Sequence, residues 1–325
     1  MPFEIVSLTE AHAGDAAALW AATYRTLRAV IPAAPARYAA PDAFLASIRE
    51  LAVSHGGVAA LERGRLVGYL TGFPITFHGR RSFFSPEWAN SVDPTAGASI
   101  VGALYSAASA LWLDAGCYSH VISTLAHDRE LLDAWRWLGF GYCVADAVRD
   151  LTPLGAGAAG VQVLRASLAD VDVLAHLVTA LENHLAAPPI FLWSDDPVDV
   201  DELRRELADP RMAYWLAWRD GRPIAYLRQG PASQDACEII VDEGTTSITG
   251  AYTEPDARGA GVGSALLDRA LTWAREQGYA CCTVDFETMN VSGARFWLWH
   301  FQPITMALWR VIDERVPSAP PAASK

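Results

Sequence analysis

The hexapeptide Arg-Gly-Ala-Gly-Val-Gly at residues 258–263 limits most strongly what this chain can fold into. It follows a β-like run at residues 247–253 and opens a stretch in which apolar residues recur at helical spacing up to Ala274. A tight turn there leaves backbone N–H groups unpaired at the start of a helix, where the helix dipole favours negative charge. The glycines let an anion approach the backbone closely. The sequence therefore predicts a phosphate cradle, followed by a helix that ends at a Gly278 cap.

Two other phosphate-binding loops do not fit these residues. A Walker loop needs Lys and then Ser or Thr after its last glycine, and no such pair follows Gly263. A dinucleotide fingerprint needs a third glycine at the position of Leu266. An ordinary glycine-rich turn remains the alternative.

The remaining pattern is Arg-x-x-Gly-x-Gly between a strand and a helix, with Asn290 standing 27 residues after Gly263 at the end of another β-like run. This pattern resembles the pyrophosphate loop of the GCN5-related N-acetyltransferases, the GNAT family. The resemblance implies acetyl-CoA as a co-substrate, no metal, and direct attack of an amine on the thioester carbonyl. The coenzyme contacts that it implies are Ala251, Tyr252, Thr253, Arg258, Gly259, Ala260, Gly261, Val262, Gly263, Ser264 and Asn290. Asn290 can equally be read as a cap of the helix that follows it.

The composition excludes several classes of partner. A net charge of −12 and a pI near 5.1 argue against a nucleic-acid partner, which needs concentrated positive charge. Five cysteines without metal-ligand spacing indicate neither a disulfide framework nor a zinc site. The N-terminus lacks the features of a signal peptide, and the most apolar run, residues 97–113, is too interrupted to span a membrane. A cytoplasmic protein that acts on a small-molecule amine is the expectation.

An internal repeat divides the chain into two halves. The segment from Gly64 matches the segment from Gly221 at an offset of 157, and Trp135 matches Trp297 at an offset of 162. The expected organisation is a degenerate GNAT domain at 1–153, a flexible linker at 154–160, a coenzyme-binding GNAT domain at 161–316 and a disordered tail at 317–325. Each domain is expected to be an α/β fold with a mixed, mainly antiparallel sheet flanked by helices, as in tandem members of the family such as the mycothiol synthases.

The first half departs from the second at the cradle. At an offset of 161, Gly97 stands in place of Arg258 and Ile100 in place of Gly261. A β-branched side chain at this point obstructs the approach of a phosphate to the backbone. We therefore expect the first half to keep the fold and to lack the coenzyme.

The chain departs from the family pattern at the residue that usually acts as the general acid. Seven residues after the asparagine, the family usually has a tyrosine that protonates the leaving thiolate, and this chain has Trp297. An indole N–H donates a hydrogen bond but is not an acid near neutral pH. Either the thiolate leaves unaided, or Tyr252 or solvent supplies the proton, or the activity is lost.

Two carboxylates are candidates for the base. Asp285 and Glu287 alternate with Val284 and Phe286 in a β-like run, so both acidic side chains fall on one face of the strand. A carboxylate there could take the proton of the amine, directly or through water. The alternative is an ion pair with Arg295 or another surface cation.

The acceptor site is expected from residues 184–196, which combine apolar and aromatic side chains with two carboxylates. The plainer interpretation places Phe191 and Trp193 in the core and Asp195 and Asp196 at a solvated helix start. The other tryptophans, Trp137 among them, are assigned to core or interdomain contacts. The sequence thus predicts an acetyl-CoA-dependent N-acetyltransferase, with a non-catalytic acetyl-CoA-binding or regulatory protein as the alternative.

Overall fold

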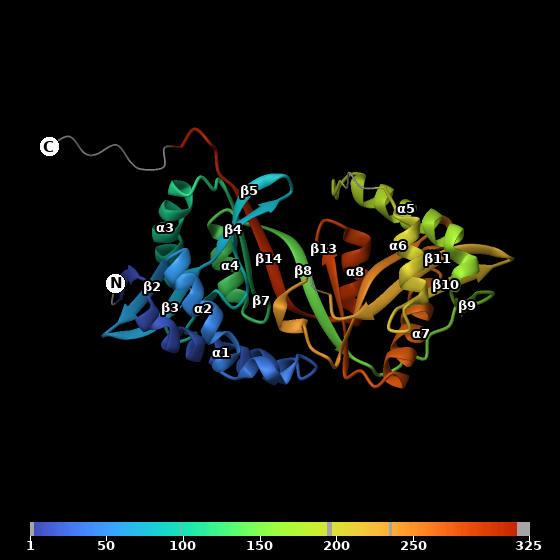
Figure 1. Cartoon of the computed structure of the whole chain (residues 1–325), viewed down its shortest axis with the longest axis horizontal. Coiled ribbons are helices and arrows are strands. Elements are labelled where there is room, and N and C mark those ends of the chain that lie inside the picture. Colours follow the sequence, from blue (N-terminus) through green and yellow to red (C-terminus); the bar gives the residue numbers. More distant parts are fainter. Residues whose placement is uncertain (1–2, 98, 194–196, 234–235, 317–325) are drawn as a thin grey trace.

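The computed structural model describes residues 3–97, 99–193, 197–233 and 236–316. The described strands form a ten-stranded sheet that runs through the middle of the molecule and a four-stranded sheet in the first half, and helices flank both (Figure 1). A lobe lies at each end of the long sheet. Strands pair mainly antiparallel, with parallel pairs between β5 and β7 and between β12 and β13. The expected mixed α/β class is confirmed.

The first half of the chain forms the left lobe of Figure 1. Its elements are β1 (Glu4–Ser7), α1 (Ala13–Val30), α2 (Asp42–Ser54), β2 (Gly57–Glu62), β3 (Arg65–Thr71), β4 (Phe73–Phe77), β5 (Arg80–Ser85), β6 (Asn90–Val92), α3 (Ser99–Asp114), β7 (Ser119–Leu125), α4 (Arg129–Trp137) and β8 (Gly141–Asp150). A hairpin turn joins β2 and β3, and its residues Arg63 and Gly64 both have positive φ.

The second half forms the right lobe. Its elements are β9 (Gln162–Arg165), α5 (Val171–Ala186), α6 (Val200–Ala208), β10 (Ala213–Arg219), β11 (Arg222–Pro231), β12 (Thr245–Thr253), α7 (Val262–Glu276), β13 (Cys281–Glu287), α8 (Val291–His300) and β14 (Gln302–Val311). The predicted cap at Gly278 is confirmed, because this glycine has a φ of +84° just past the end of α7.

The two halves exchange their last strands. In the central sheet the order is β7, β14, β8, β13, so β14 of the second half pairs with β7 of the first, and β8 of the first half pairs with β13 of the second. Trp309 lies opposite Val121 in the first of these pairs, and Phe286 lies opposite Ala145 in the second. Each lobe therefore takes its closing strand from the other sequence half.

The first half repeats the strand order of the second with two interruptions. Across the second lobe, the strands lie in the order β9, β10, β11, β12 and β13. The first lobe repeats this order as β1, β2, the segment β3–β4, the segment β5–β6, and β7. The bend between β3 and β4 falls at Gly72, where a Cβ atom would lie 2.1 Å from the carbonyl oxygen of Phe84. Only glycine fits at this bend.

Four apolar clusters hold the layers together. α1 and α2 cover one face of the first lobe and α3 and α4 the other, whereas α5 and α6 cover one face of the second lobe and α7 and α8 the other. The assignment of tryptophans to the interior holds for Trp20, Trp112 and Trp135. It is wrong for Trp137, whose side chain is 90% exposed at the end of α4.

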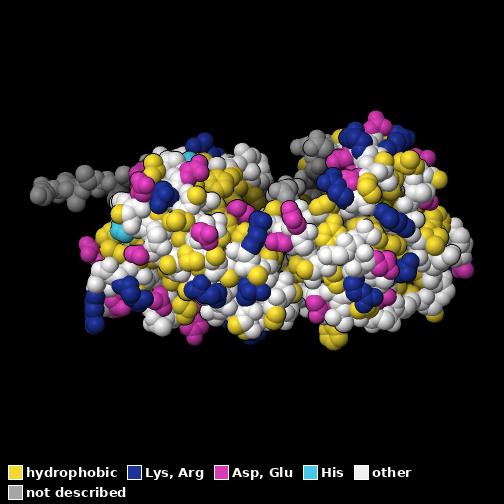
Figure 2. Space-filling view, turned by 60° about the horizontal axis from the view of Figure 1, so that its bottom comes forward, with side chains coloured by type: hydrophobic (Ala, Val, Ile, Leu, Met, Phe, Trp, Pro, Cys, Tyr) yellow, Lys and Arg dark blue, Asp and Glu magenta, His cyan; other side chains and the backbone are white. Residues whose placement is uncertain are grey.

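The surface carries both signs of charge. Basic and acidic side chains are interspersed over the face in Figure 2, with no large patch of one sign. No helix among the described residues is long and apolar enough to cross a membrane.

Candidate active site

The site begins where β12 and β13 separate. The two strands are paired in parallel from Thr245 opposite Cys281 to Ile248 opposite Val284, and no pairing follows beyond that point. β12 continues to Thr253 on β11 alone, with a bulge just after Ile248. The bulge turns β12 away from β13, which opens a V-shaped gap between them.

The backbone of β12 presents amide groups to this gap. The N–H of Glu254 donates to the carbonyl of Ile224 on β11 at 2.9 Å. Because N–H groups alternate in direction along a strand, the N–H of Tyr252 also points to β11. Those of Ala251 and Thr253 point to the gap. The alternation therefore separates the three predicted backbone contacts into two amides that face the gap and one that does not.

The glycine turn closes one end of the gap. α7 begins from Gly261, which is its N-cap and has a φ of +79°. Within the described residues, no acceptor is found for the backbone N–H groups of residues 259–264. The Nε of Arg258 donates to the carbonyl of Thr253 at 2.9 Å, and its guanidinium lies 5.5 Å from the ring centre of Tyr252. A helix N-terminus with open donors beside a guanidinium suits a phosphate.

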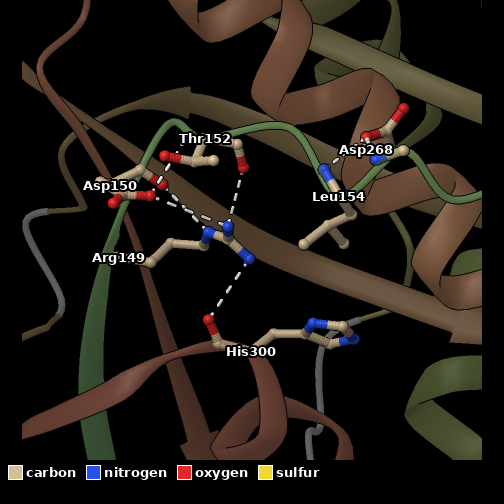
Figure 3. A network of polar contacts seen from close by, with 7 residues as sticks. Arg149, Asp150, Thr152, Leu154, Asp268 and His300 are labelled. Carbon is tan, nitrogen blue, oxygen red and sulfur yellow. Dashed lines mark hydrogen bonds and ion pairs between the residues drawn. The ribbon is translucent and has the colours of Figure 1, made fainter.

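The linker between the halves lies against this turn. A Cβ atom at Gly261 would lie 3.5 Å from the carbonyl oxygen of Gly157. Asp268 on α7 accepts from the backbone N–H of Leu154 at 2.7 Å, and Figure 3 shows this contact beside Arg149. Arg149 donates to the carbonyl of His300 at the end of α8 at 3.3 Å. Asp268 of α7 thus holds the first two residues of the expected linker, Leu154 and Gly155.

A pocket of about 460 Å³ joins these parts. Its walls include backbone of β12, the glycine turn, and side chains of α5, α7 and α8. The predicted residues that line it are Ala251, Tyr252, Thr253, Arg258, Gly259, Gly261, Val262, Gly263, Ser264, Asn290 and Trp297. Ala260 is the one predicted cradle residue outside this lining. The volume is in the range of pockets for small molecules and cofactors.

Asn290 caps the N-terminus of α8, and Trp297 lies within this helix. The side-chain oxygen of Asn290 accepts from the N–H of Gly293 at 3.1 Å, so the cap interpretation is confirmed, and the residue also lines the pocket. Trp297 is 8% exposed, and its ring makes edge contacts with Phe296 and Phe301 at 4.8 and 5.6 Å between ring centres. The indole of Trp297 is therefore packed in the core on one side, and the same residue lines the pocket.

The two carboxylates of β13 lie on one face, as the alternation predicts. Val284 and Phe286 are buried with α7 and α8. Burial raises the pKa of Glu287 to about 7, and the negative charge of Asp285 adds to this rise. The Oε2 atom of Glu287 is buried without a hydrogen-bond partner among the described residues. Asp285 lines a second pocket, on the other side of β13, and Glu287 lines neither pocket.

The segment expected to bind the acceptor is half-buried or exposed where it is described, except for Ile190, which is buried. Phe191 and Trp193 are 68% and 73% exposed, so their assignment to the core is wrong. They follow the C-terminal end of α5 in a loop with no regular structure, which leaves no sheet or helix to cover them. Asp195 and Asp196 lie outside the described residues, as does the tail from residue 317. The next helix, α6, is capped by Asp199 instead.

Several lining residues were not predicted as site residues. Leu181 reaches the pocket from α5. His184, the first residue of the segment expected to bind the acceptor, also lines it, and the rings of His184 and Tyr252 are 6.3 Å apart. Phe296 reaches it from α8, and Tyr226 from β11. Their helical or strand spacing resembles that of core residues, so the sequence carries no signal that separates them from the core.

The splayed strands, the glycine turn and the helix that begins from it define the second half as an acetyltransferase fold. Residues 178–298 match the model of the acetyltransferase (GNAT) family. Among the described residues, no group of three or more side chains is placed to hold a metal ion.

The chain as a whole is similar to solved acetyltransferases in fold. It is 13% identical to a GCN5-related N-acetyltransferase from Sphaerobacter thermophilus, with 95% of each chain covered and a TM-score of 0.56. It is 16% identical to a tandem GNAT protein from the clavulanic acid biosynthesis pathway, with 98% of this chain and 99% of that chain covered and a TM-score of 0.48. No curated protein matches its sequence.

Proposed function

We propose that the chain is an N-acyltransferase that moves the acetyl group of acetyl-CoA to the amine of a small cationic or neutral acceptor. The observation that carries this proposal is the single pocket in which the open N–H groups of the glycine turn meet the gap between β12 and β13. One end of this pocket suits a pyrophosphate, and the other presents two backbone N–H groups to a carbonyl.

In this proposal the coenzyme lies along the gap. The N–H groups of residues 259–264 and the guanidinium of Arg258 hold the pyrophosphate. The N–H groups of Ala251 and Thr253 face the thioester carbonyl and stabilise the oxyanion that forms when the amine attacks it. Donors that are already in position stabilise the oxyanion without having to reorganise in the transition state.

Two proton transfers complete the reaction. The attacking amine loses a proton to Glu287 or Asp285, directly or through water, and both carboxylates lie on one face of β13, the strand from which β12 separates. A pKa of about 7 suits Glu287 to this role, since the carboxylate is half ionised at neutral pH. The thiolate leaves without an acid, or with a proton from Tyr252 or solvent, since a thiol pKa of about 8–9 makes it a fair leaving group.

The first half supplies no second coenzyme site in this proposal. Where β6 and β7 separate, the side-chain amide of Asn90 bridges the opening and donates to the carbonyl of Ser123 at 2.8 Å. Ile100, at the position of Gly261, is fully buried against Gly68. The space that a coenzyme would need is occupied by these side chains.

A second candidate function is coenzyme binding without catalysis. Trp297 favours it, because the residue at the usual position of the acid carries no titratable proton. The experiment that separates the two is the release of free thiol from acetyl-CoA, measured with and without each member of a panel of small amines. Amine-dependent release supports the transferase. Tight coenzyme binding with no release for any amine supports the binder.

A further inference from the structure

The pocket of about 460 Å³ has two sides, one on each face of the β11–β12 pair. Leu227 and Ala251 lie opposite each other in this pair, and both pack in the cluster of α7 and α8. The neighbouring pair, Tyr226 and Tyr252, packs in the cluster of α5. The glycine turn opens α7 and so belongs to the first side. In the proposed function the coenzyme therefore lies beside α7 and α8, and the side beneath α5 is left for the acceptor.

The hydroxyl of Tyr226 lies on the α5 side of this pocket and is unpaired. Tyr226 is 2% exposed and lines the pocket, and within the described residues its hydroxyl has no hydrogen-bond partner. The hydroxyl oxygen is 3.1 Å from the position that a Cβ atom on Gly250 would occupy, just before Ala251. Because an unpaired buried hydroxyl costs free energy of folding, such groups are uncommon in a protein interior. The position of this one beside the gap indicates a partner supplied by a ligand.

The first half has the same tyrosine with its hydroxyl paired. Tyr69 matches Tyr226 at the offset of 157 that relates the two halves. Tyr69 is fully buried, and its hydroxyl donates to the carbonyl of Trp88 at 2.6 Å. The half without the cradle thus satisfies this hydroxyl within the fold, whereas the half with the cradle leaves it open.

The bulge in β12 explains the difference. The residue in the position of Trp88 is Thr249, because each stands three residues before the partner of its tyrosine in the strand pair. Thr249 is the residue at which β12 bulges, between Ile248 and Gly250. Its carbonyl does not accept from Tyr226 in the way that Trp88 accepts from the tyrosine of the first half. The irregularity that opens the gap therefore also frees the hydroxyl beside it.

The chemistry of Tyr226 suits a hydrogen bond to the amine better than a proton transfer to the thiolate. Burial raises the pKa of Tyr226 above its ordinary value, so the side chain stays a neutral phenol. A phenol with a raised pKa is a poor acid for a thiolate whose thiol has a pKa of about 8–9. Its oxygen can still accept a hydrogen bond from an N–H group.

We propose that the hydroxyl oxygen of Tyr226 accepts a hydrogen bond from the attacking amine and holds the lone pair of that amine toward the thioester carbonyl. The backbone N–H of Ala251 faces the carbonyl from the gap at the same time. Leu181, His184 and Tyr252 line the same side, so the body attached to the amine packs among apolar and ring side chains. The identity of the ligand as the acceptor amine rests on the proposed function.

The test compares Tyr226→Phe with Tyr69→Phe, the matched substitution in the first half, in the full chain. Tyr226→Phe removes a hydroxyl that has no partner within the described fold, so the midpoint of urea unfolding should stay the same or rise. Tyr69→Phe removes the hydrogen bond to Trp88 and leaves a buried carbonyl without its donor, so its midpoint should fall.

Benzylamine is the probe for the acceptor. Its binding to the chain loaded with coenzyme A is observed by saturation-transfer NMR, and its reaction by thiol release from acetyl-CoA. In Tyr226→Phe the value of kcat/KM for benzylamine should fall roughly tenfold, about the contribution of one hydrogen bond, and the NMR signal should weaken. Acetyl-CoA affinity, measured by calorimetry, should stay at the wild-type value. Tyr69→Phe should keep both the kcat/KM of the folded protein and the NMR signal.

Each of the other outcomes decides against the proposal or against the reaction. A Tyr226→Phe variant that keeps kcat/KM and the NMR signal, loses stability as Tyr69→Phe does, or loses acetyl-CoA affinity would overturn the proposal. So would a wild type that does not bind benzylamine. If binding of benzylamine depends on Tyr226 but no thiol is released, the contact stands and the proposed reaction fails.

Discussion

The carbonyl oxygen of Gly157 lies 3.5 Å from the position that a Cβ atom on Gly261 would occupy. The linker between the halves thus lies beside the turn from which α7 begins. A side chain at position 261 would meet both a left-handed backbone conformation and this carbonyl.

Gly261→Ile should remove coenzyme binding while the fold remains. The substitution places a β-branched residue at a φ of +79° and fills the space beside the turn. We expect acetyl-CoA affinity to fall by roughly 100-fold or more, which corresponds to about 2.7 kcal/mol. Gly278→Ile is the control, because Gly278 has a φ of +84° at the other end of α7 with no atom within 4 Å of its Cβ position. Equal affinities for the two variants in calorimetry would show that the turn is not the cradle.

Glu287→Gln should lower the turnover number far more than it lowers coenzyme affinity. A positioned base contributes roughly 10²–10⁴-fold in rate. In the wild type the rate at saturating amine should rise with pH through an apparent pKa of about 7, because the base acts in its ionised form. A loss below tenfold for both Glu287→Gln and Asp285→Asn would assign the pair to structure.

If Glu287 is the base, Asp285→Asn should shift the pH dependence of the rate and should not abolish the activity. Asp285 raises the pKa of Glu287 through its negative charge, so its removal should lower that pKa and shift the profile to lower pH. Steady-state rates between pH 5 and 9 give the comparison. A profile that stays in place, or moves upward, would contradict this coupling.

The raised pKa of Glu287 also leads to a prediction for the stability of the fold. Its pKa in the folded state is raised from 4.5 to about 7, so the folded state holds the proton more tightly than the unfolded state does. Its contribution to stability is complete below pH 4.5 and is lost as the pH rises through about 7. Denaturant titrations at pH 4.5 and 8 should show a smaller fall in unfolding free energy for Glu287→Gln than for the wild type. Identical falls would mean that Glu287 is not buried as described.

Trp297 separates the enzyme from the binder. If the thiolate leaves without an acid, Trp297→Phe should keep most of the activity, and Trp297→Tyr should raise the rate little. The loss of packing against Phe296 and Phe301 should cost about 1–3 kcal/mol of stability, since the new ring fills less of the site. If the protein only binds the coenzyme, the wild type would release no thiol, and Trp297→Tyr would recover a trace at most. A fall of 10³-fold in Trp297→Phe would make the indole part of the chemistry.

Local patterns in the sequence predicted much of the local structure around the candidate site. The helical spacing after Gly263 and the cap at Gly278 are features of consecutive residues, and the structure has both. The alternation of Asp285 and Glu287 with apolar residues placed the two carboxylates on one face for the same reason. The cap made by Asn290 follows from its position just before a helix.

Long-range pairing could not be predicted in this way. Nothing local to β8 or β14 indicates that each pairs with a strand of the other half, so the exchange of these strands could not be predicted from the sequence pattern. The prediction that Phe191 and Trp193 are buried was wrong for a related reason. Aromatic residues are usually buried, and only the course of the chain after α5 shows that no element covers them.

The number of coenzyme sites per chain tests the central claim most directly. The account places one cradle in the second half, where Arg258 and Gly261 stand, and none in the first, where Asn90 and Ile100 fill the corresponding space. Calorimetric titration of the full chain with acetyl-CoA should therefore give a stoichiometry of one, and Gly261→Ile should abolish that binding. Two equivalent sites, or one site that survives Gly261→Ile, would contradict the account.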